Sequence, residues 1–249
     1  MTNSERRITY LPQVLAPPGE ALPDWRILTR FAHTLGFQAA FPYTTAEEIF
    51  EEYKQCTAGR PNDITGVSYA RLRQEPVQWP CPHPDSPGTA RLYTDHLFPT
   101  PEGTARFVPV AYHGPAEPTD AMYPFALTSG RVKDHWHSRT RTGHVEVFKR
   151  RNPEPFVELH PHDAHRLGIQ DADFVEVTGR RGKVIAQARV TAEIRQGMCF
   201  IPMHWGRLAG FYKAVNNLTS RACDPVSRQA ELKYAAVSIR KILDVVFPD

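Results

Sequence analysis

The pattern of apolar and polar residues changes twice along the chain and divides it into three regions. In the first region, one set of apolar side chains recurs at the spacing of a helical face. These side chains are Trp25, Leu28, Phe31, Ala32 and Leu35. Pro23 stands near the start of this pattern and Gly36 directly after it, so the sequence predicts a helix over residues 24–35.

A second helix is predicted to begin after Thr45. Glu48 follows Thr45 at the spacing of a capping box, in which each residue satisfies a free backbone N–H of the other. Three apolar residues then share one face of the helix, namely Ile49, Phe50 and Tyr53. The helix should end near Gly59, and a third, short helix is predicted within residues 63–74.

The second region, residues 76–118, carries ten of the 23 prolines. Proline removes a backbone donor and fixes φ, so regular helices and central strands are disfavoured here. The sequence therefore predicts an extended connector. A hairpin is an alternative prediction for part of this region, because Pro101-Glu102-Gly103 forms a suitable turn ahead of residues 106–110.

The third region contains seven short apolar or alternating runs that predict strands. They are FALTS, VEVF, FVELH, DFVEVTG, KVIAQARVT, MCFIP and AAVSIRKI. Residues 179–182, Gly-Arg-Arg-Gly, predict a hairpin turn, and residues 160–169 predict one helix that begins at Pro161 and closes at Gly168. Several strands around one helix, without a βαβ rhythm, favour a closed or nearly closed β-barrel. The fold class is mixed α and β.

Composition describes a water-soluble globular chain. The 249 residues are 41% hydrophobic and 23% charged, and they are enough to bury a core. No run reaches the length of a membrane span, and the first residues lack the apolar stretch of a signal peptide, so the cytoplasm is the expected location. The net charge is only +3, and basic residues are interleaved with acidic ones except around residues 131–151 and 180–183. This pattern favours a local anion site over a nucleic-acid-coating surface.

The four cysteines do not predict a metal centre. Cys56, Cys81, Cys199 and Cys223 are far apart and form no CxxC pair. They are expected to be buried or idle thiols.

Residues 124–148 contain the first candidate site. Arg131 and Arg139 can form bidentate bonds with phosphate, and Ser129 and Gly130 offer backbone N–H groups with close approach. Trp136 supplies a plane for a heterocycle. Together they indicate recognition of a large, flat, anionic molecule.

Two alternatives remain for this segment. His135 and His137 flank Trp136 and could share a face toward a metal, but the sequence shows no third ligand and no supporting shell. The segment could also be a solvated basic loop whose tryptophan is anchored in the core.

A second candidate site spans IPMHWG, residues 201–206, and residues 216–233. An apolar strand that ends in polar and aromatic residues is a common setting for a ligand on a β-barrel. The amides of Asn216 and Asn217 could pair with a base edge, and Lys233 could meet a phosphate. Taken singly, the asparagines also suit turns and Lys233 suits a solvated surface.

Other catalytic patterns have no support in this sequence. No Gly-x-Ser-x-Gly elbow, GxGxxG or GxxxxGK[ST] is present. The paired carboxylates at positions 47–48 and 51–52 fall on the polar side of a predicted helix and are best explained as a solvated face.

Taken together, the motifs resemble the C-terminal part of bacterial molybdopterin oxidoreductases, most closely the assimilatory nitrate reductases. The resemblance rests on LTSGRVKDHWHSRTRTG, PEPFVELHPHDAHRLGIQDADFVEVTGRRG, IPMHWG and NNLTSRACDPVSRQAELKYAAV. It extends upstream through PPGEALPDWRILTRFAHTLGF, EEIFEEYKQCTAGRPNDITGVSYARL and PTPEGTARF, and so covers nearly the whole chain. Formate dehydrogenases have a similar ending, and the nitrate assignment rests mainly on PMHWG and ITGVSYARL.

The resemblance implies a fold, a cofactor and its contacts. It implies a C-terminal double-psi β-barrel over residues 119–249, after a helical segment over 1–75 and a Pro-rich connector over 76–118. The cofactor would be bis-molybdopterin guanine dinucleotide, and Met203 would lie toward the substrate funnel. The residues that match cofactor contacts are Ser129, Gly130, Arg131, Val132, Lys133, Asp134, His135, Trp136, His137, Ser138, Asn216 and Lys233.

The same resemblance implies that other parts of such an enzyme lie outside this sequence. The iron-sulfur segment and a molybdenum-binding cysteine have no counterpart here, so the chain is expected to bind cofactor without turning over nitrate alone. No catalytic residue and no metal ligand is assigned. A cluster-bearing N-terminal portion or subunit is the expected partner, and part of the stripe between Trp25 and Phe31 is expected to stay exposed without it. The alternatives are the same section of a formate dehydrogenase and a repurposed barrel that acts as a binding module.

Overall fold

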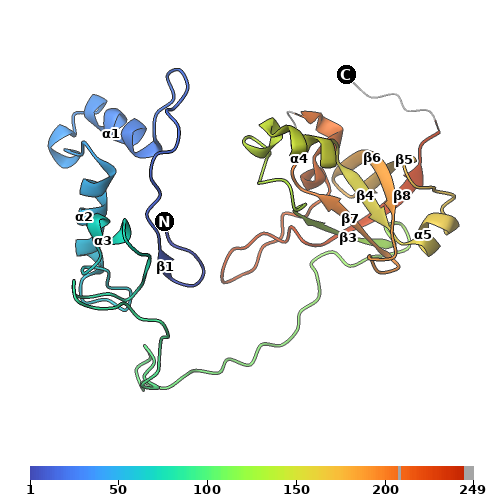
Figure 1. Cartoon of the computed structure of the whole chain (residues 1–249). Coiled ribbons are helices and arrows are strands. Elements are labelled where there is room, and N and C mark those ends of the chain that lie inside the picture. The colour runs from blue at the N-terminus through green and yellow to red at the C-terminus, as the bar shows by residue number, and fades with distance from the viewer. Residues whose placement is uncertain (207–208, 244–249) are drawn as a thin grey trace. The chain divides into compact units, whose positions relative to one another are not determined.

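The chain folds as two compact units, Met1–Pro109 and Val110–Asp249. The computed structural model describes residues 1–206 and 209–243. The first unit runs from blue to green in Figure 1, and the second continues to red. The sequence placed boundaries after residues 75 and 118, whereas the structure has one boundary, between residues 109 and 110.

The first unit is mostly helical and carries one two-stranded sheet. Its elements are β1 (Arg7–Ile8), α1 (Asp24–Thr34), η1 (Gln38–Ala40), α2 (Ala46–Thr57), α3 (Tyr69–Leu72) and β2 (Val77–Gln78), where η denotes a 3-10 helix. The three predicted helices are present. β1 and β2 pair antiparallel, with Ile8 opposite Val77.

The predicted helix ends of this unit are confirmed in detail. Thr45 Oγ1 accepts from the Glu48 backbone N–H at 3.2 Å, and Glu48 Oε2 accepts from the Thr45 N–H at 3.0 Å, which completes the capping box of α2. After α1, Gly36 has a φ of 89° and its N–H donates to the His33 carbonyl. This left-handed position suits glycine and ends the helix.

The apolar stripe of α1 lies partly in solvent, as expected. Leu28 is 63% exposed and Phe31 is 62% exposed, while Ala32, the small residue of the same stripe, is buried. The exposed part is therefore a contiguous apolar face on one helix.

The Pro-rich stretch after residue 75 does not act only as a connector. Val77 and Cys81 are fully buried and belong to the core of the first unit, with Ile8, Ile64, Val67 and Leu72. Because these side chains are apolar and β2 pairs with β1, residues 76–81 are held within this unit. The connector prediction was wrong for this part of the chain.

Residues 98–103 form a turn without a hairpin. Phe98 N–H donates to the Gly103 carbonyl at 2.9 Å, and Gly103 N–H donates to the Thr100 carbonyl at 3.0 Å. The residues that follow, 106–110, are not in a strand. The predicted turn is therefore present, but the strands that would make it a hairpin are not.

The second unit is a closed six-stranded barrel with short helices at its ends (Figure 1). Its strands, in the order β3-β7-β4-β6-β5-β8 around the barrel, are mixed in direction. They are β3 (Phe125–Gly130), β4 (Phe156–Leu159), β5 (Phe174–Gly179), β6 (Gly182–Val190), β7 (Met198–Pro202) and β8 (Ala235–Lys241). Its helices are η2 (Thr142–His144), α4 (Glu146–Arg151), α5 (Pro161–Arg166), η4 (Phe211–Lys213) and η5 (Val215–Asn217).

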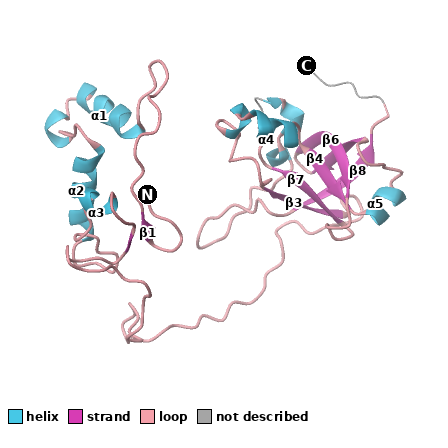
Figure 2. Cartoon of the chain, viewed as in Figure 1, coloured by secondary structure: helices cyan, strands magenta, loops and turns pink. Residues whose placement is uncertain are grey.

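Two parallel strand pairs define the topology of this barrel. β3 runs parallel to β7 and β4 runs parallel to β6, while the remaining neighbours are antiparallel. This closed, mixed, six-stranded arrangement confirms the expected double-psi type of barrel. Figure 2 shows the strands gathered in one body, with α4 and α5 at opposite ends.

Six of the seven predicted strand runs form the barrel. The predicted hairpin is present, with Gly179 paired to Gly182 across the β5–β6 turn. The predicted helix over residues 160–169 is α5, with Pro161 at its first position and Gly168 at a φ of 65° after its end. Strand alternation and glycine placement were therefore sufficient signals in these segments.

The run VEVF is the exception, because it begins helix α4 and is not a strand. Val145 and Val147 are both exposed, so their alternation does not mark a buried face. Glu146 lies in the first turn of α4 and three basic residues lie in its last turn, which favours a helix through the macrodipole.

The barrel encloses the larger apolar core of the chain. Its most buried large side chains include Phe125, Leu127, Leu159, Ile201 and Leu218. Cys199 is buried within it as a free thiol, and its burial raises the pKa of that thiol far above the usual range. None of the helices in the described ranges is long and apolar enough to cross a membrane, and the cytoplasmic location stays a prediction.

Candidate functional site

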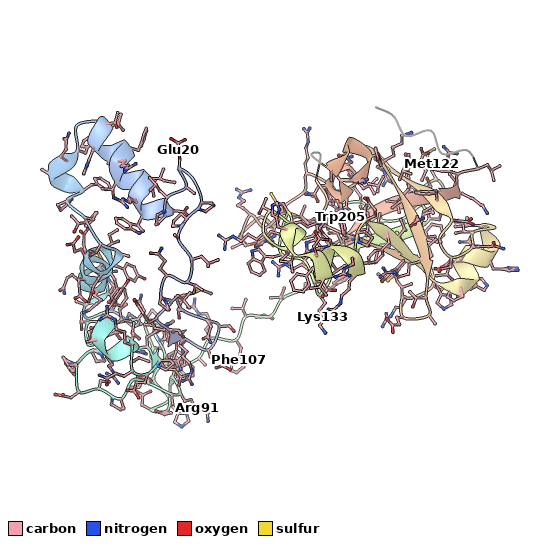
Figure 3. The ribbon with its side chains drawn as sticks, turned by 45° about the horizontal axis from the view of Figure 1, so that its top comes forward. Glu20, Arg91, Phe107, Met122, Lys133 and Trp205 are labelled. Carbon is pink, nitrogen blue, oxygen red and sulfur yellow. The ribbon has the colours of Figure 1, made fainter. Side chains whose placement is uncertain are left out.

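The two candidate segments leave the barrel at the same edge. β3 and β7 are parallel and end with Gly130 opposite Pro202, so the residues that follow each strand emerge side by side. Met203 N–H donates to the Gly130 carbonyl at 2.8 Å and continues the pairing by one step. Figure 3 labels Lys133 and Trp205, one from each segment, in the part of the second unit that carries α4.

Lys233 is held against the start of the first segment. Its Nζ donates to the Ser129 carbonyl at 2.5 Å, and Ser129 Oγ donates to the Leu232 carbonyl at 2.6 Å. A Cβ on Gly130 would lie 2.9 Å from a ring carbon of Phe200 and 3.7 Å from Lys233 Nζ. The absence of a side chain at Gly130 therefore lets the Lys233 ammonium approach the backbone at the end of β3.

His204 fixes the loop that follows β3. The side chain is buried, its Nε2 accepts from the Val132 N–H at 2.9 Å, and its Nδ1 donates to the His137 carbonyl at 2.7 Å. Since a backbone N–H can only donate and a carbonyl can only accept, this pair of bonds requires neutral imidazole with its proton on Nδ1. One ring thereby spans residues 132–137.

The loop contains two residues in the left-handed region of φ. His137 has a φ of 41° and Arg139 has a φ of 67°, and Arg139 N–H closes the turn by donating to the Trp136 carbonyl at 2.9 Å. Such conformations are strained for residues with a side chain and persist where surrounding contacts hold them. The His204 bond to the His137 carbonyl is one such contact.

His135 supports the loop from inside the protein. It is buried, and its Nε2 lies 2.9 Å from the Asn152 carbonyl, to which it donates. Its ring meets those of His204 and Trp205 edge to face, each at a centroid distance of 5.7 Å. His135 therefore supports the loop from inside the protein, and its role as a cofactor contact remains a prediction.

Exposed groups of the loop suit an anionic, planar ligand. The Arg131 guanidinium carbon lies 5.5 Å from the centre of the Trp136 ring, and Trp136 is 56% exposed. Trp136 is thus not anchored in the core, which removes that alternative for the loop. Lys133 is also exposed, as are His137 and Ser138.

Asp134 ties the loop to the end of α4. Its two carboxylate oxygens accept from Arg151 Nη1 and from Asn152 Nδ2, each at 3.1 Å. Val132 is half-buried, and its N–H is the donor to His204. These two residues shape the loop and present little surface to a ligand.

Two predicted contacts lie apart from this cluster or turn inward. Asn216 is exposed on η5, and no hydrogen bond among the described residues joins it to residues 129–138. The side chain of Met203 is partly buried against the barrel core, although its backbone adjoins Gly130. The roles of Asn216 and Met203 remain predictions.

Several physical causes set the pKa of His204. Burial lowers it most, and the positive side chains of Arg131 and Arg139, together with His135, lower it further. The hydrogen bond to the His137 carbonyl opposes them, and the net direction is a lowered pKa. His204 therefore stays neutral in the folded barrel at neutral pH, as its two hydrogen bonds require.

The lowered pKa predicts a loss of stability in weak acid. The unfolded chain takes up the proton near its ordinary pKa of about 6.5, whereas the folded chain resists until a lower pH. The free energy of unfolding should therefore be unaffected by this group above about pH 6.5. Below that it should fall by up to about 1.4 kcal/mol per pH unit until the folded pKa is reached.

Urea unfolding at pH 7.5, 6.5 and 5.5 checks this prediction. A His204→Gln variant carries no titrating group at this position and should show a flatter profile over the same range. The carboxylates whose pKa is lowered, such as Asp173 and Asp224, change the free energy of unfolding only at lower pH. Equal slopes for the variant and the parent would contradict the assignment.

The described residues contain no group of three or more His, Cys, Asp or Glu side chains placed to hold a metal ion. The four cysteines are free, with Cys81 and Cys199 buried and Cys56 and Cys223 exposed.

Sequence reasoning did not find the role of His204. The motif IPMHWG marked this strand end, but the bond to the Val132 N–H joins residues 72 positions apart. Histidine followed by tryptophan after an apolar strand was the available signal, and it does not by itself identify the loop that the histidine holds.

Comparison with known proteins finds relatives over most of the chain. Residues 125–236 match a family model described as "Molydopterin dinucleotide binding domain". The chain is 45% identical over 247 residues to a nitrate reductase of Synechocystis sp., with 97% of this chain and 35% of that protein covered. It is 38% identical over 242 residues to F420-dependent formate dehydrogenase subunit alpha of Methanocaldococcus jannaschii, with 97% and 34% covered.

A solved structure shares the fold. Acetylene hydratase from Pelobacter acetylenicus superimposes with a TM-score of 0.68 at 20% sequence identity, over 93% of this chain and 34% of that chain. The chain thus spans about a third of the length of the relatives it matches.

Proposed function

Because the chain belongs, through residues 125–236, to the family of the molybdopterin dinucleotide binding domain, we propose that it is the cofactor-binding section of a molybdenum-dependent nitrate reductase. The cofactor we propose is bis-molybdopterin guanine dinucleotide, shared with the remainder of a longer enzyme or with a cluster-bearing subunit. The observation that carries the proposal is the contact of Lys233 with Ser129, beside the loop that His204 holds.

The residues of the site fit a dinucleotide. A Cβ on Gly130 would lie 2.9 Å from a ring carbon of Phe200 and 3.7 Å from the Lys233 ammonium, so only glycine lets the strand end lie this close to both groups. Arg131 and Lys133 add two exposed cations from the same loop, and Trp136 adds an exposed ring. The cations suit the anionic phosphates of a dinucleotide, and the exposed aromatic ring suits its flat ring systems.

The roles we propose follow from the chemistry of each side chain. Arg131 and Lys233 would bind phosphate oxygens, Trp136 would stack on a heterocycle, and Asn216 would bond with a base edge. His204 and His135 would hold the loop in its binding conformation. When bound, the cofactor supplies the redox chemistry by which nitrate, two electrons and two protons yield nitrite and water.

Nitrate is proposed over formate because the nitrate reductase relative is 45% identical and the formate dehydrogenase relative is 38% identical over nearly the same span. Reconstitution of the chain with a partner that carries the iron-sulfur segment would separate the two. Reduction of nitrate without oxidation of formate is expected, and the reverse result would assign the chain to a formate dehydrogenase.

Loss of the Lys233 charge should weaken cofactor binding. A charge-assisted hydrogen bond is worth at least about 1.5 kcal/mol, so Lys233→Met should retain about tenfold less cofactor than the parent. Lys233→Arg keeps the charge and should recover part of the binding. The measurement is the amount of guanine dinucleotide released from chain purified from a host that makes the cofactor.

The control is Lys241→Met, which also removes one cation from the barrel. Lys241 pairs with Asp173 at 2.7 Å, away from Ser129 and its loop. Cofactor retention should match the parent in this variant. Equal retention by Lys233→Met and Lys241→Met, or no cofactor in the parent, would overturn the proposed function.

A further inference from the structure

A basic cavity lies beside the loop, next to its Arg139 end. It has a volume of about 520 Å³ and is lined by four cations, two glutamates and the Trp205 ring. The cations are Arg139, Lys149, Arg150 and Lys213. We propose that this cavity is a binding site for a small oxyanion, held by Arg139 and by the indole N–H of Trp205.

The charges of the cavity are not balanced. Lys149 pairs with Glu146 at 3.2 Å, and Lys213 pairs with Glu154. In the part of the chain that the structure describes, Arg139 and Arg150 form no ion pair. Two positive charges are therefore left for a ligand, which favours an anion.

Arg139 is fixed at the wall of the cavity. Its guanidinium carbon lies 4.7 Å from the centre of the Trp205 ring, and its left-handed backbone turns it there. A Cβ on Gly143 would lie 3.2 Å from the Cβ of Arg139 and 3.8 Å from its Nε. The bare backbone of Gly143 therefore makes room for this side chain.

Two buried donors at this wall have no acceptor. Trp205 is 2% exposed, and neither its Nε1 nor the Nε of Arg139 has a hydrogen-bond partner among the described residues. A buried N–H without an acceptor costs about 1–3 kcal/mol and is rare in native proteins. Both side chains line the cavity, and an oxyanion bound there would supply the acceptor that these two donors lack.

The chemistry fits a trigonal or tetrahedral oxyanion such as nitrate, formate or phosphate, because the arginine fork matches such groups. The phosphate could be free or part of a nucleotide. The sequence also offered Arg139 as a phosphate-binding residue, but neither Arg139 nor Trp205 is among the residues that match cofactor contacts. Binding at this site can therefore be tested apart from the proposed cofactor.

The indole signal of Trp205 provides a direct test. In the ¹⁵N-labelled full chain, the four tryptophans give separate Nε1–H resonances, and the signal lost in Trp205→Phe identifies Trp205. Sodium nitrate, sodium formate, inorganic phosphate and GMP are titrated at constant ionic strength against sodium chloride. The Trp205 resonance is expected to shift saturably with an oxyanion, while those of Trp25 and Trp79 stay in place.

Variants connect the shift to the proposed donors. Arg139→Gln should raise the Kd at least tenfold, and Arg139→Lys, which keeps the charge, should raise it less. Gly143→Ala keeps every charge but crowds Arg139, and it should also weaken binding. Arg195→Gln removes an exposed cation before the opposite end of β7, and its Kd should stay within twofold of the parent value.

Each outcome decides the proposal. Tighter binding of nitrate or formate identifies a free small anion, and tighter binding of phosphate or GMP identifies a phosphate group; either supports the site. An immobile Trp205 signal, an equal shift with chloride, or an unchanged Kd in Arg139→Gln would overturn it. Cofactor retention by the parent chain is measured separately, so failure here leaves the proposed function standing.

Discussion

Replacement of His204 by phenylalanine is expected to lower the free energy of unfolding of residues 110–249 by about 2–3 kcal/mol and to release the loop after β3. Phenylalanine fills the space of the ring but leaves the Val132 N–H and the His137 carbonyl without their partner. Each lost bond to a partly buried group costs about 1 kcal/mol or more. Urea unfolding measures the first effect, and hydrogen exchange at the Val132 amide measures the second.

His204→Gln is the matched variant, because its side-chain amide keeps one donor and one acceptor. It should recover part of the stability and part of the protection at Val132. Cofactor retention should fall more in His204→Phe than in His204→Gln, since His137 would lose the contact that holds its left-handed φ of 41°. Full protection of the Val132 amide in His204→Phe would show that the loop is held by other contacts.

Replacement of Gly66 by alanine is expected to unfold the first unit while leaving the barrel intact. A Cβ at Gly66 would lie 2.1 Å from the carbonyl oxygen of His83 and 2.2 Å from its carbonyl carbon. These are backbone atoms, and Gly66 N–H also donates to the Cys81 carbonyl at 2.9 Å. The two backbone segments therefore cannot move apart without losing this hydrogen bond. The expected loss is about 3 kcal/mol or more, at the upper end for overpacking.

Hydrogen exchange read by mass spectrometry can follow the two units separately. Gly66→Ala should remove protection from the buried residues of the first unit, such as Val67 and Val77, and leave Leu159 and Ile201 in the barrel protected. Gly114→Ala is the control, because a Cβ there meets nothing within 4 Å. Native exchange throughout the first unit of Gly66→Ala would contradict the steric argument.

The elements that the sequence predicted well are those whose signals are local. Three of these features involve only residues that are a few positions apart in the sequence. They are the capping box of Thr45 and Glu48, the helix end at Gly36 and the Gly179–Gly182 turn. Alternation of apolar residues identified the barrel strands because every second side chain enters one core. The strand prediction for VEVF failed because four residues are too few to distinguish a strand from the first turn of a helix.

The site was predicted less completely, because its contacts join distant parts of the chain. The resemblance brought Ser129 and Lys233 into one site, and the structure shows the hydrogen bond between them. The exposed Trp136 and the buried His135 look equivalent in the sequence, and only packing against Trp205 distinguishes them. The unpaired donors of Arg139 and Trp205 likewise follow from packing and from no motif.

The closure of the barrel by β3 and β8 has a consequence for the order of folding. Lys233 and Ser129 are 104 positions apart, and β3 pairs with β8 in the same closure. Contacts of such long range form slowly, because the chain loses loop entropy before it gains them. A nascent chain could therefore complete its local helices and the β5–β6 hairpin without yet having a place for a ligand, and that place would form only when the last strand is added.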